Sequence, residues 1–210
     1  MKLVIIGAGG HGRVVADCAQ QLKHYQEIVF LDECFPNSKH DCEWPIIGSM
    51  SDVAAHLENS TFIVAIGNNQ IRGKILKQLV HAGANIATLV HPSAVISPNA
   101  ELKKGTIVCA NAVVSVGCTI GDGCIINTGA TVDHDCKLES YVHISPGVNV
   151  AGGVTIGKHS WLGIASTVIE CIVIAPNCQV GAGAAVIHST QENSLYLGVP
   201  AKRIRALKNI

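Results

Sequence analysis

The chain has 210 residues, 48% of them hydrophobic, and its fifteen basic residues balance its fifteen acidic residues. A chain of this length can bury one large core or two small ones, and zero net charge provides no positive field to attract nucleic acid or an anionic membrane. No apolar stretch is long enough for a signal-peptide core or a membrane span, so composition predicts a cytoplasmic protein with small-molecule partners.

The chain begins with an apolar segment, residues 3–6, that runs directly into the string GAGGHG. Gly7, Gly9 and Gly12 have the G-x-G-x-x-G spacing of a dinucleotide-binding loop, and Asp32 follows where that fingerprint has its acidic residue. Backbone amides and a helix N-terminus at such a loop can receive a phosphate group. A tight strand-to-helix turn without a ligand would use the same glycines.

Over residues 1–90, short apolar strands alternate with helical segments. We expect strands at 3–6, 28–32, 62–66 and 86–90, and helices at about 13–22, 52–57 and 70–81. This alternation predicts a small parallel sheet with right-handed crossovers. Because such a sheet provides only one mononucleotide-binding half, its size argues against an NAD-dependent dehydrogenase.

A second string, AIGNNQIR, follows the third expected strand. It places Gly67 and Asn68 at the carboxyl edge of the sheet, beside the glycine loop, where ligands of open α/β sheets bind. Asn69 could equally cap the helix that follows. The string HPSA at 91–94 marks the end of the first part of the chain, because Pro92 keeps the residue before it out of helical angles.

From residue 94 to residue 189 every sixth position, beginning with Ile96, is aliphatic. The first position of each block of six is mostly small or β-branched. Glycine, asparagine or aspartate gathers near the block ends, where corners need unusual backbone angles. This period suits one flat side and one corner of a three-sided coil, and it predicts a parallel β-helix with both recurring positions pointing inward.

The nine cysteines are odd in number and include no C-x-x-C pair, which argues against a disulfide framework and a zinc ribbon. Four of them share the small inward position of the repeat, where a thiol packs as a compact hydrophobe. These four are Cys118, Cys124, Cys136 and Cys178. We therefore expect no metal site at these cysteines.

The string TVDHDC carries the main catalytic signal. It places His134 at a corner between Asp133 and Asp135, and a carboxylate that holds one ring nitrogen fixes the tautomer and raises the basicity of the other. An exposed Asp-His-Asp turn without a function would have the same sequence.

The geometry of a three-sided coil places further residues around this corner. Residues eighteen apart stack one rung away, so Gly152 should lie beside His134, where its backbone amide could bind a developing oxyanion. His143 lies half a turn around the coil, so the two histidines can face each other only across two subunits. This separation predicts a cyclic trimer with shared sites.

With these features together, the chain resembles the family of UDP-4-amino-sugar N-acetyltransferases (PglD) and sialic acid O-acetyltransferases (NeuD), which are hexapeptide transferases. The resemblance rests on the strings GAGGHG, FLDE, AIGNNQIR, HPSA, VDHD and GVPAKRI, which run from one end of the chain to the other. It implies an α/β Rossmann-like domain for a nucleotide sugar at 1–90. It also implies a left-handed parallel β-helix acetyltransferase domain with a C-terminal tail at 91–210.

The resemblance further implies roles for individual residues. His134 would be the general base and Asp135 would orient it. The nucleotide sugar would be held by Gly9, Gly10, His11, Asp32, Glu33, Gly67 and Asn68. Acetyl-CoA would lie along His143, Gly152, Ile164 and Ala182, and no metal would be required. The family often has glutamate at the position of Asp135 and glycine at that of Ala182.

The implied activity is direct transfer of an acetyl group from acetyl-CoA to the amino group of a nucleotide-linked sugar, with a UDP-4-amino-4,6-dideoxy sugar as the expected substrate. The product would serve glycan or surface polysaccharide biosynthesis, and a homotrimer would form the active sites between its subunits. An O-acetyltransferase acting on sialic acid or another sugar would use the same base, and a non-catalytic nucleotide-sugar-binding protein would use the same first domain. A γ-class carbonic anhydrase shares the β-helix, but the H-x4-H pair of its zinc site does not occur in this sequence.

Overall fold

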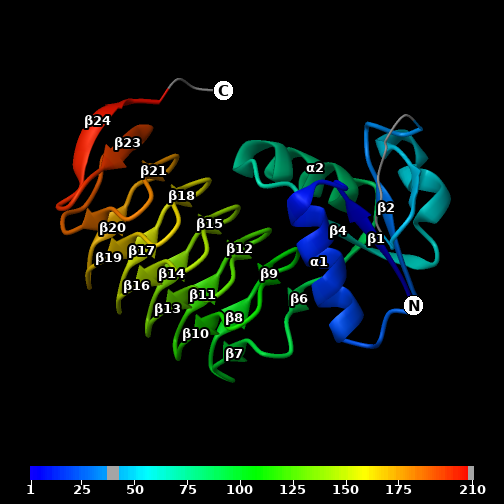
Figure 1. The fold of residues 1–210 in the computed structure, drawn as a ribbon, viewed down its shortest axis with the longest axis horizontal. Helices are drawn as coiled ribbons and strands as arrows, with labels where there is room; N and C mark the ends of the chain where they lie inside the picture. Colours follow the sequence, from blue (N-terminus) through cyan, green and yellow to red (C-terminus); the bar gives the residue numbers. More distant parts are fainter. Residues whose placement is uncertain (37–42, 208–210) are drawn as a thin grey trace.

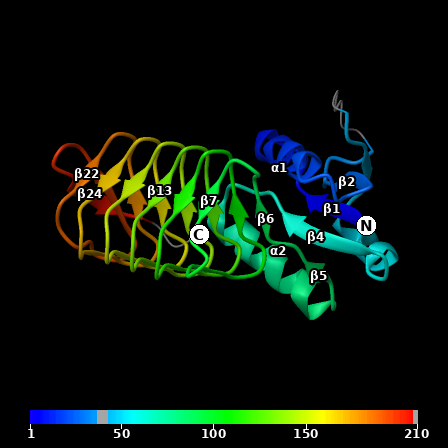
Figure 2. The same cartoon turned by 90° about the horizontal axis from the view of Figure 1, so that it is seen from below.

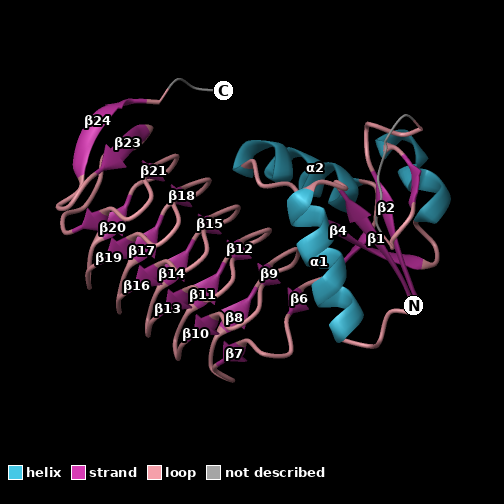
Figure 3. Cartoon of the chain, in the orientation of Figure 1, coloured by secondary structure: helices cyan, strands magenta, loops and turns pink. Residues whose placement is uncertain are grey.

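The computed structural model describes residues 1–36 and 43–207. Two parts follow each other along the chain, an N-terminal α/β sheet and a long three-sided coil (Figure 1). Helices lie beside the N-terminal sheet, whereas the coil is built of short strands and turns (Figure 3). The fold is the predicted one, a Rossmann-like sheet followed by a left-handed parallel β-helix.

The N-terminal sheet has five parallel strands in the order β3-β2-β1-β4-β5. Its elements are β1 (Lys2–Ile6), α1 (Gly10–Gln21), β2 (Glu27–Leu31), β3 (Ile46–Gly48), the 3-10 helix η1 (Met50–His56), β4 (Ser60–Val64), α2 (Asn69–His81) and β5 (Asn85–Ile86). Alternate side chains of a strand point to opposite faces. Leu3 and Ile5 therefore pack with α1, and Val4 and Ile6 pack on the side of α2. Figure 2 shows the two helices on opposite sides of the sheet.

Three elements of this sheet differ from the expectation. The sequence does not predict β3, because three residues are too few to show a period. The helix expected at 52–57 is the 3-10 helix η1. The strand expected at 86–90 is divided, since β5 pairs with β4 whereas β6 (Leu89–Val90) pairs with β9 of the coil. The domain boundary between residues 90 and 91 stays a prediction.

The strands of the coil form three faces. The first face contains β7, β10, β13, β16, β19 and β22; the second contains β8, β11, β14, β17 and β20; the third contains β6, β9, β12, β15, β18 and β21, extended by β23 and β24. We call the turn from the first to the second face the first corner, and the following turns the second and the third corner. Paired strands are eighteen residues apart, as Val113 and Thr131 show, so three sides complete one rung.

The strand bounds repeat with the same regularity. They are β7 (Val95–Ile96), β8 (Glu101–Leu102), β9 (Ile107–Val108), β10 (Val113–Val114), β11 (Thr119–Ile120), β12 (Ile125–Ile126), β13 (Thr131–Val132), β14 (Lys137–Leu138), β15 (His143–Ile144), β16 (Asn149–Val150), β17 (Thr155–Ile156), β18 (Trp161–Leu162), β19 (Thr167–Val168), β20 (Val173–Ile174), β21 (Gln179–Val180), β22 (Ala185–Val186), β23 (Ser194–Leu197) and β24 (Lys202–Ala206).

The predicted inward positions form the core of the coil. From Thr106 to Val186 they are buried, except for the half-buried Ile172, and on the first rung they are partly buried. Each large aliphatic side chain contributes roughly 1.5–3 kcal/mol of burial. The four inward cysteines are buried as well, and their S–H groups donate to backbone carbonyls on the next rung at 2.9–3.2 Å.

From residue 105 to residue 183, each corner contains one residue with positive φ, and these residues recur every six positions. They are Gly105, Asn111, Gly117, Gly123, Gly129, Asp135, Tyr141, Gly147, Gly153, His159, Ala165, Cys171, Asn177 and Gly183. Glycine adopts this region without strain, and asparagine and aspartate tolerate it better than most residues. The prediction that corners need unusual backbone angles is confirmed.

Across the described ranges, the helices are too short or too polar to cross a bilayer.

The repeat predicts that inward residues determine folding and that their outward neighbours do not. On β14, Leu138 is buried and Lys137 is exposed. Leu138→Asp removes apolar burial and places an unpaired carboxylate in the core, at a total cost of several kcal/mol. That is a large part of the roughly 5–15 kcal/mol that stabilises a typical domain. We expect Leu138→Asp to yield no soluble folded protein, whereas Lys137→Asp should keep the parent's circular dichroism spectrum and yield.

Candidate active site

The glycine loop lies between the end of β1 and the start of α1, at the carboxyl edge of the sheet. Gly7 has a φ of 101°, and a Cβ at Gly12 would collide with the carbonyl oxygen of Gly7. By contrast, nothing lies within 4 Å of the positions that a Cβ would take at Gly9 and Gly10. Gly9 caps α1 without a side-chain bond, so the first amides of the helix are available to a ligand.

Asp32 ties this loop to the end of β2. Its carboxylate accepts the backbone N–H of Ala8 at 2.7 Å and that of Cys34 at 2.9 Å. Each carboxylate oxygen can accept a further hydrogen bond, so the predicted contact of Asp32 with a substrate stays compatible with this role. Glu33 is the next residue and is exposed.

The loop after β4 brings Gly67 and Asn68 to the same edge. The side chain of Asn68 accepts the backbone N–H groups of Gln70 and Ile71, each at 3.0 Å. The N-cap of α2 is therefore Asn68, and the alternative assignment to Asn69 is wrong. The loops after β1, β2 and β4 are neighbours because their strands are adjacent, so the seven predicted substrate residues lie together, and their roles stay predictions.

Two histidines meet where the N-terminal sheet packs on the coil. The rings of His11 on α1 and His143 on β15 stack with centroids 6.4 Å apart, and Trp161 stacks on the other side of His143 at 6.0 Å. Burial lowers the pKa of His11 to about 4 and that of His143 to about 3, and the positive charge of Arg72 adds to both effects. Both rings are therefore neutral near pH 7.

One ring nitrogen of His11 lacks a partner. Within the described ranges, Nε2 of His11 is buried and makes no hydrogen bond. Leaving a buried polar nitrogen unpaired is costly, and a hydroxyl or phosphate group of a bound ligand would satisfy it. This atom supports the predicted role of His11 in substrate binding.

His134 lies at the first corner, directly after β13. Its Nδ1 donates to the carboxylate of Asp135 at 2.9 Å, and its backbone N–H donates to Asp133 at 2.7 Å. The bond to Asp135 and then the charge of Asp133 raise the pKa of His134. Because the proton is held on Nδ1, Nε2 is left as a base.

Two glycines make room for this pair of side chains. A Cβ at Gly152, one rung further on, would lie 2.5 Å from Nε2 of His134, and a Cβ at Gly117, one rung before, would collide with the carboxylate of Asp135. The predicted neighbourhood of Gly152 and His134 is confirmed, and Gly117 is an addition that the eighteen-residue spacing alone could have revealed.

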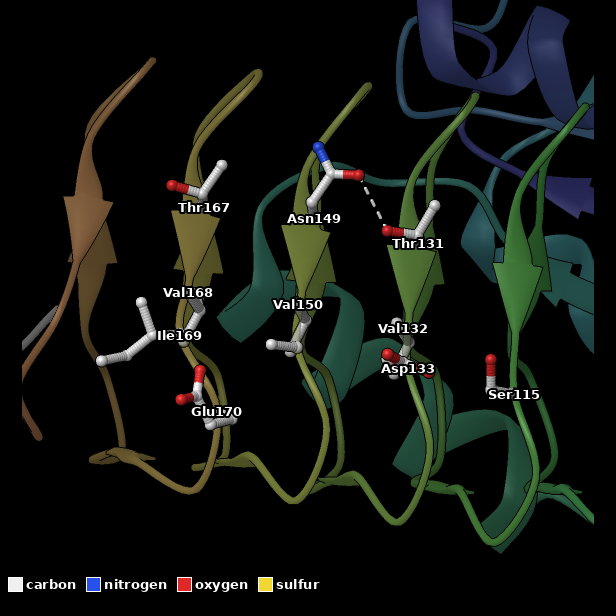
Figure 4. A pocket seen from close by; sticks show the side chains of 11 residues that line it. Ser115, Thr131, Val132, Asp133, Asn149, Val150, Thr167, Val168, Ile169 and Glu170 are labelled. Atoms are coloured by element: carbon white, nitrogen blue, oxygen red, sulfur yellow. Dashed lines mark hydrogen bonds between the residues drawn. The ribbon is translucent and has the colours of Figure 1, made fainter.

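A cavity of about 440 Å³ extends from this corner over the first face. Thr131, Asn149 and Thr167 stand in a row on three successive strands, and Asp133 and Glu170 lie toward the corner (Figure 4). Thr131 donates to Asn149 at 2.8 Å. The cavity is open, and the side chains of Thr131, Asn149 and Thr167 place polar groups along one side of it, so a ligand with hydroxyl or amide groups could bind there.

The four predicted acetyl-CoA residues do not line one groove within a single chain. Gly152 is at the first corner, Ile164 and Ala182 stack at the third corner, and His143 is on the third face. The N-terminal sheet also packs on the third face, through Ile107 and Cys109. In a three-sided coil, the third face is opposite the first corner, so the predicted substrate loops and His134 of one chain lie on opposite sides of the coil.

Comparison with known proteins agrees with this architecture. The family model described as the PglD N-terminal domain matches residues 2–79. A UDP-N-acetylbacillosamine N-acetyltransferase of Bacillus subtilis is 32% identical over 112 residues, which are 52% of this chain and 51% of that protein. This alignment therefore spans about half the length of the relative.

Solved structures match over nearly the whole chain. The acetyltransferase domain of PglB from Neisseria gonorrhoeae, in complex with acetyl coenzyme A, is 39% identical with a TM-score of 0.93, over 97% of this chain and 98% of that one. A histidine-to-alanine variant of GDP-perosamine N-acetyltransferase from Caulobacter crescentus, in complex with CoA and GDP-perosamine, is 33% identical with a TM-score of 0.93, over 98% and 97%.

The contact between residue 152 and the ring of His134 generates a prediction. In Gly152→Ala the added methyl would displace the ring and weaken its bond to Asp135, so the pKa of His134 should fall toward its ordinary value. An NMR titration of the histidine rings measures this pKa. Ala151→Gly, which changes one methyl group at the neighbouring position, is the control and should leave it unchanged. An unaltered pKa in Gly152→Ala would contradict the contact.

Proposed function

This chain belongs to the PglD-like family of sugar N-acetyltransferases, and on that basis we propose that it transfers the acetyl group of acetyl-CoA to the amino group of a nucleotide-linked amino sugar. The relatives support this class, because one is a UDP-N-acetylbacillosamine N-acetyltransferase and another was solved with CoA and GDP-perosamine. A UDP-4-amino-4,6-dideoxy sugar remains our expected substrate. We expect the product to serve glycan or surface polysaccharide biosynthesis.

The observation that carries the proposal is the hydrogen bond between Nδ1 of His134 and Asp135. The sugar amine attacks the thioester carbonyl, and Nε2 of His134 takes the proton of the amine as the carbon–nitrogen bond forms. The carbon–sulfur bond then breaks, and the protonated imidazole returns its proton to the leaving thiolate of coenzyme A. The backbone amide of Gly152 is the proposed donor to the oxyanion. The reaction needs no metal, because these two groups supply the base and the donor.

We also propose that the active site forms between the subunits of a homotrimer. The substrate loops and His134 lie on opposite sides of one coil, so a sugar held by one chain can reach only the His134 of another. Exposed apolar side chains at two corners support such contacts: Val116 and Ile169 lie at the first corner, and Ile164 lies at the third. Ile164 and Ala182 of one subunit would then face Gly152 of the next across the acetyl-CoA groove. We expect the reaction in the cytoplasm.

Rate measurements as a function of pH test the role of His134. Because its pKa is raised above 6.5, the basic form is lost as the pH falls through that raised pKa, and kcat/KM should fall on the acid side. Asp135→Asn should move this acid limb to lower pH, since it removes the largest cause of the raised pKa. His134→Ala should lower turnover by about 10²–10⁴, whereas His24→Ala, at an exposed site, should not. More than half of the parental rate in His134→Ala would refute the assignment.

Complementation between inactive variants tests the shared site. Gly9→Asp places a carboxylate where nothing lies within 4 Å of the Cβ, so the protein should fold and repel an anionic substrate. Neither this variant nor His134→Ala should be active alone. In randomly mixed trimers, a site between two subunits combines the intact parts of both variants in about a quarter of cases, and activity should return to that level. No recovery in mixed trimers, or a solution mass of one chain, would contradict the proposal.

A further inference from the structure

Arg72 on α2 is a fully buried arginine whose five N–H groups all have partners. Its Nε donates to the carbonyl of Gly123 at 2.7 Å, and Nη1 donates to the carbonyls of Ile66 at 2.9 Å and Gly67 at 3.2 Å. Nη2 donates to the side chain of Asn69 and to the carbonyl of Tyr141 at 3.0 Å. The guanidinium has no donor left.

These acceptors connect the substrate loop with the coil. Ile66 and Gly67 belong to the loop after β4, whereas Gly123 and Tyr141 lie on two successive rungs at the second corner. Asn69 continues the pattern, since its amide nitrogen donates to the carbonyl of His159 at 2.9 Å, one rung further on. Arg72 and Asn69 therefore bind the same corner position on three successive rungs.

The close packing of α2 on this corner leaves little freedom. A Cβ at Gly73 would lie 3.0 Å from side-chain atoms of both Tyr141 and His159. The loop with Gly67 and Asn68 is thus held at a fixed distance from the coil, because the helix that follows it cannot slide along the second corner.

No acidic group of residues 1–36 or 43–207 neutralises the charge of Arg72. All five acceptors are uncharged, and no carboxylate within the described ranges forms an ion pair with it. Burial lowers the pKa of Arg72 to about 10, so the side chain is positively charged near pH 7. An uncompensated buried charge is costly, and its field extends to His11 and His143 beside the glycine loop.

We propose that Arg72 is a positioning residue for the nucleotide sugar, which it serves by holding the Gly67 loop against the coil and by attracting the diphosphate of the substrate to the glycine loop. The inference rests on the proposed function for the class of ligand, an anionic nucleoside diphosphate derivative. Unlike the proposed acetyl transfer, the proposed role of Arg72 in binding requires neither acetyl-CoA nor His134. The substrate anion would provide the opposite charge that the described residues do not place next to Arg72.

Binding measurements with UDP and GDP as probes test the proposal, with uridine and guanosine as uncharged counterparts. Arg72→Met should raise the Kd of the diphosphate that binds the parent protein roughly tenfold or more. The Kd of acetyl-CoA should stay within about twofold, because three of the four residues expected along its groove lie at the first and third corners, whereas Arg72 binds the second corner, and solvent screens the remaining effect of the charge. Arg72→Lys keeps the charge but can make at most three of the five hydrogen bonds, so it should lose less diphosphate affinity than Arg72→Met. Lys74→Met, which removes an exposed charge from the same helix, is the matched control and should leave both affinities unchanged.

If Arg72→Met lowers the affinities for diphosphate and acetyl-CoA equally, the role of Arg72 is merely structural and the proposal is overturned. Unchanged diphosphate affinity in folded Arg72→Met would also overturn it. Should Arg72→Met and Arg72→Lys fail to fold, the Nε resonance of Arg72 in the parent protein decides by NMR. The diphosphate should shift this resonance and the nucleoside should not, and equal shifts would refute the charge effect. Diphosphate binding without acetyl transfer would leave this inference standing and refute the proposed function.

Discussion

The stacking of inward side chains on one another, eighteen residues apart, is the interaction on which the rest of the structure depends. Backbone hydrogen bonds hold neighbouring strands about 4.8 Å apart, and the stacked side chains fix the register, because a shift by one residue would turn every inward side chain outward. Functional groups at the corners of successive rungs therefore lie at a fixed spacing from one another. Gly152 lies against His134, and the carbonyls of Gly123 and Tyr141 align for Arg72, for this one reason.

The same regularity explains what could be predicted from the sequence and what could not. An uninterrupted six-residue period determines faces, corners and neighbours by arithmetic, so the inward cysteines and the pair of Gly152 with His134 could be placed without a structure. The packing of the N-terminal sheet on the coil has no such period. The stack of His11 on His143 and the division between β5 and β6 depend on contacts between the sheet and the coil and could not be predicted, whereas Trp161 follows His143 by eighteen residues.

Arg72 is an intermediate case. On α2 it shares the buried face with Leu76 and Leu79, at helical spacings of four and seven residues. A charged residue on an apolar helix face signals a special environment, but two of the five partners of Arg72 lie on two rungs of the coil more than fifty residues away. The sequence alone could indicate that Arg72 is unusual, whereas only the structure shows what it holds.

Three histidines near the proposed reaction receive different protonation states from their surroundings. Burial and the field of Arg72 keep His11 and His143 neutral, whereas two carboxylates favour the proton on the exposed His134. In the proposed reaction, proton transfer would thereby be confined to His134. That imidazole is oriented by Asp135, which also turns the chain at the first corner with a φ of 56°. Because Asp135 both forms the corner and orients the proposed base, the coil and the proposed chemistry depend on the same residue, and Gly117 and Gly152 leave space for the side chains of Asp135 and His134.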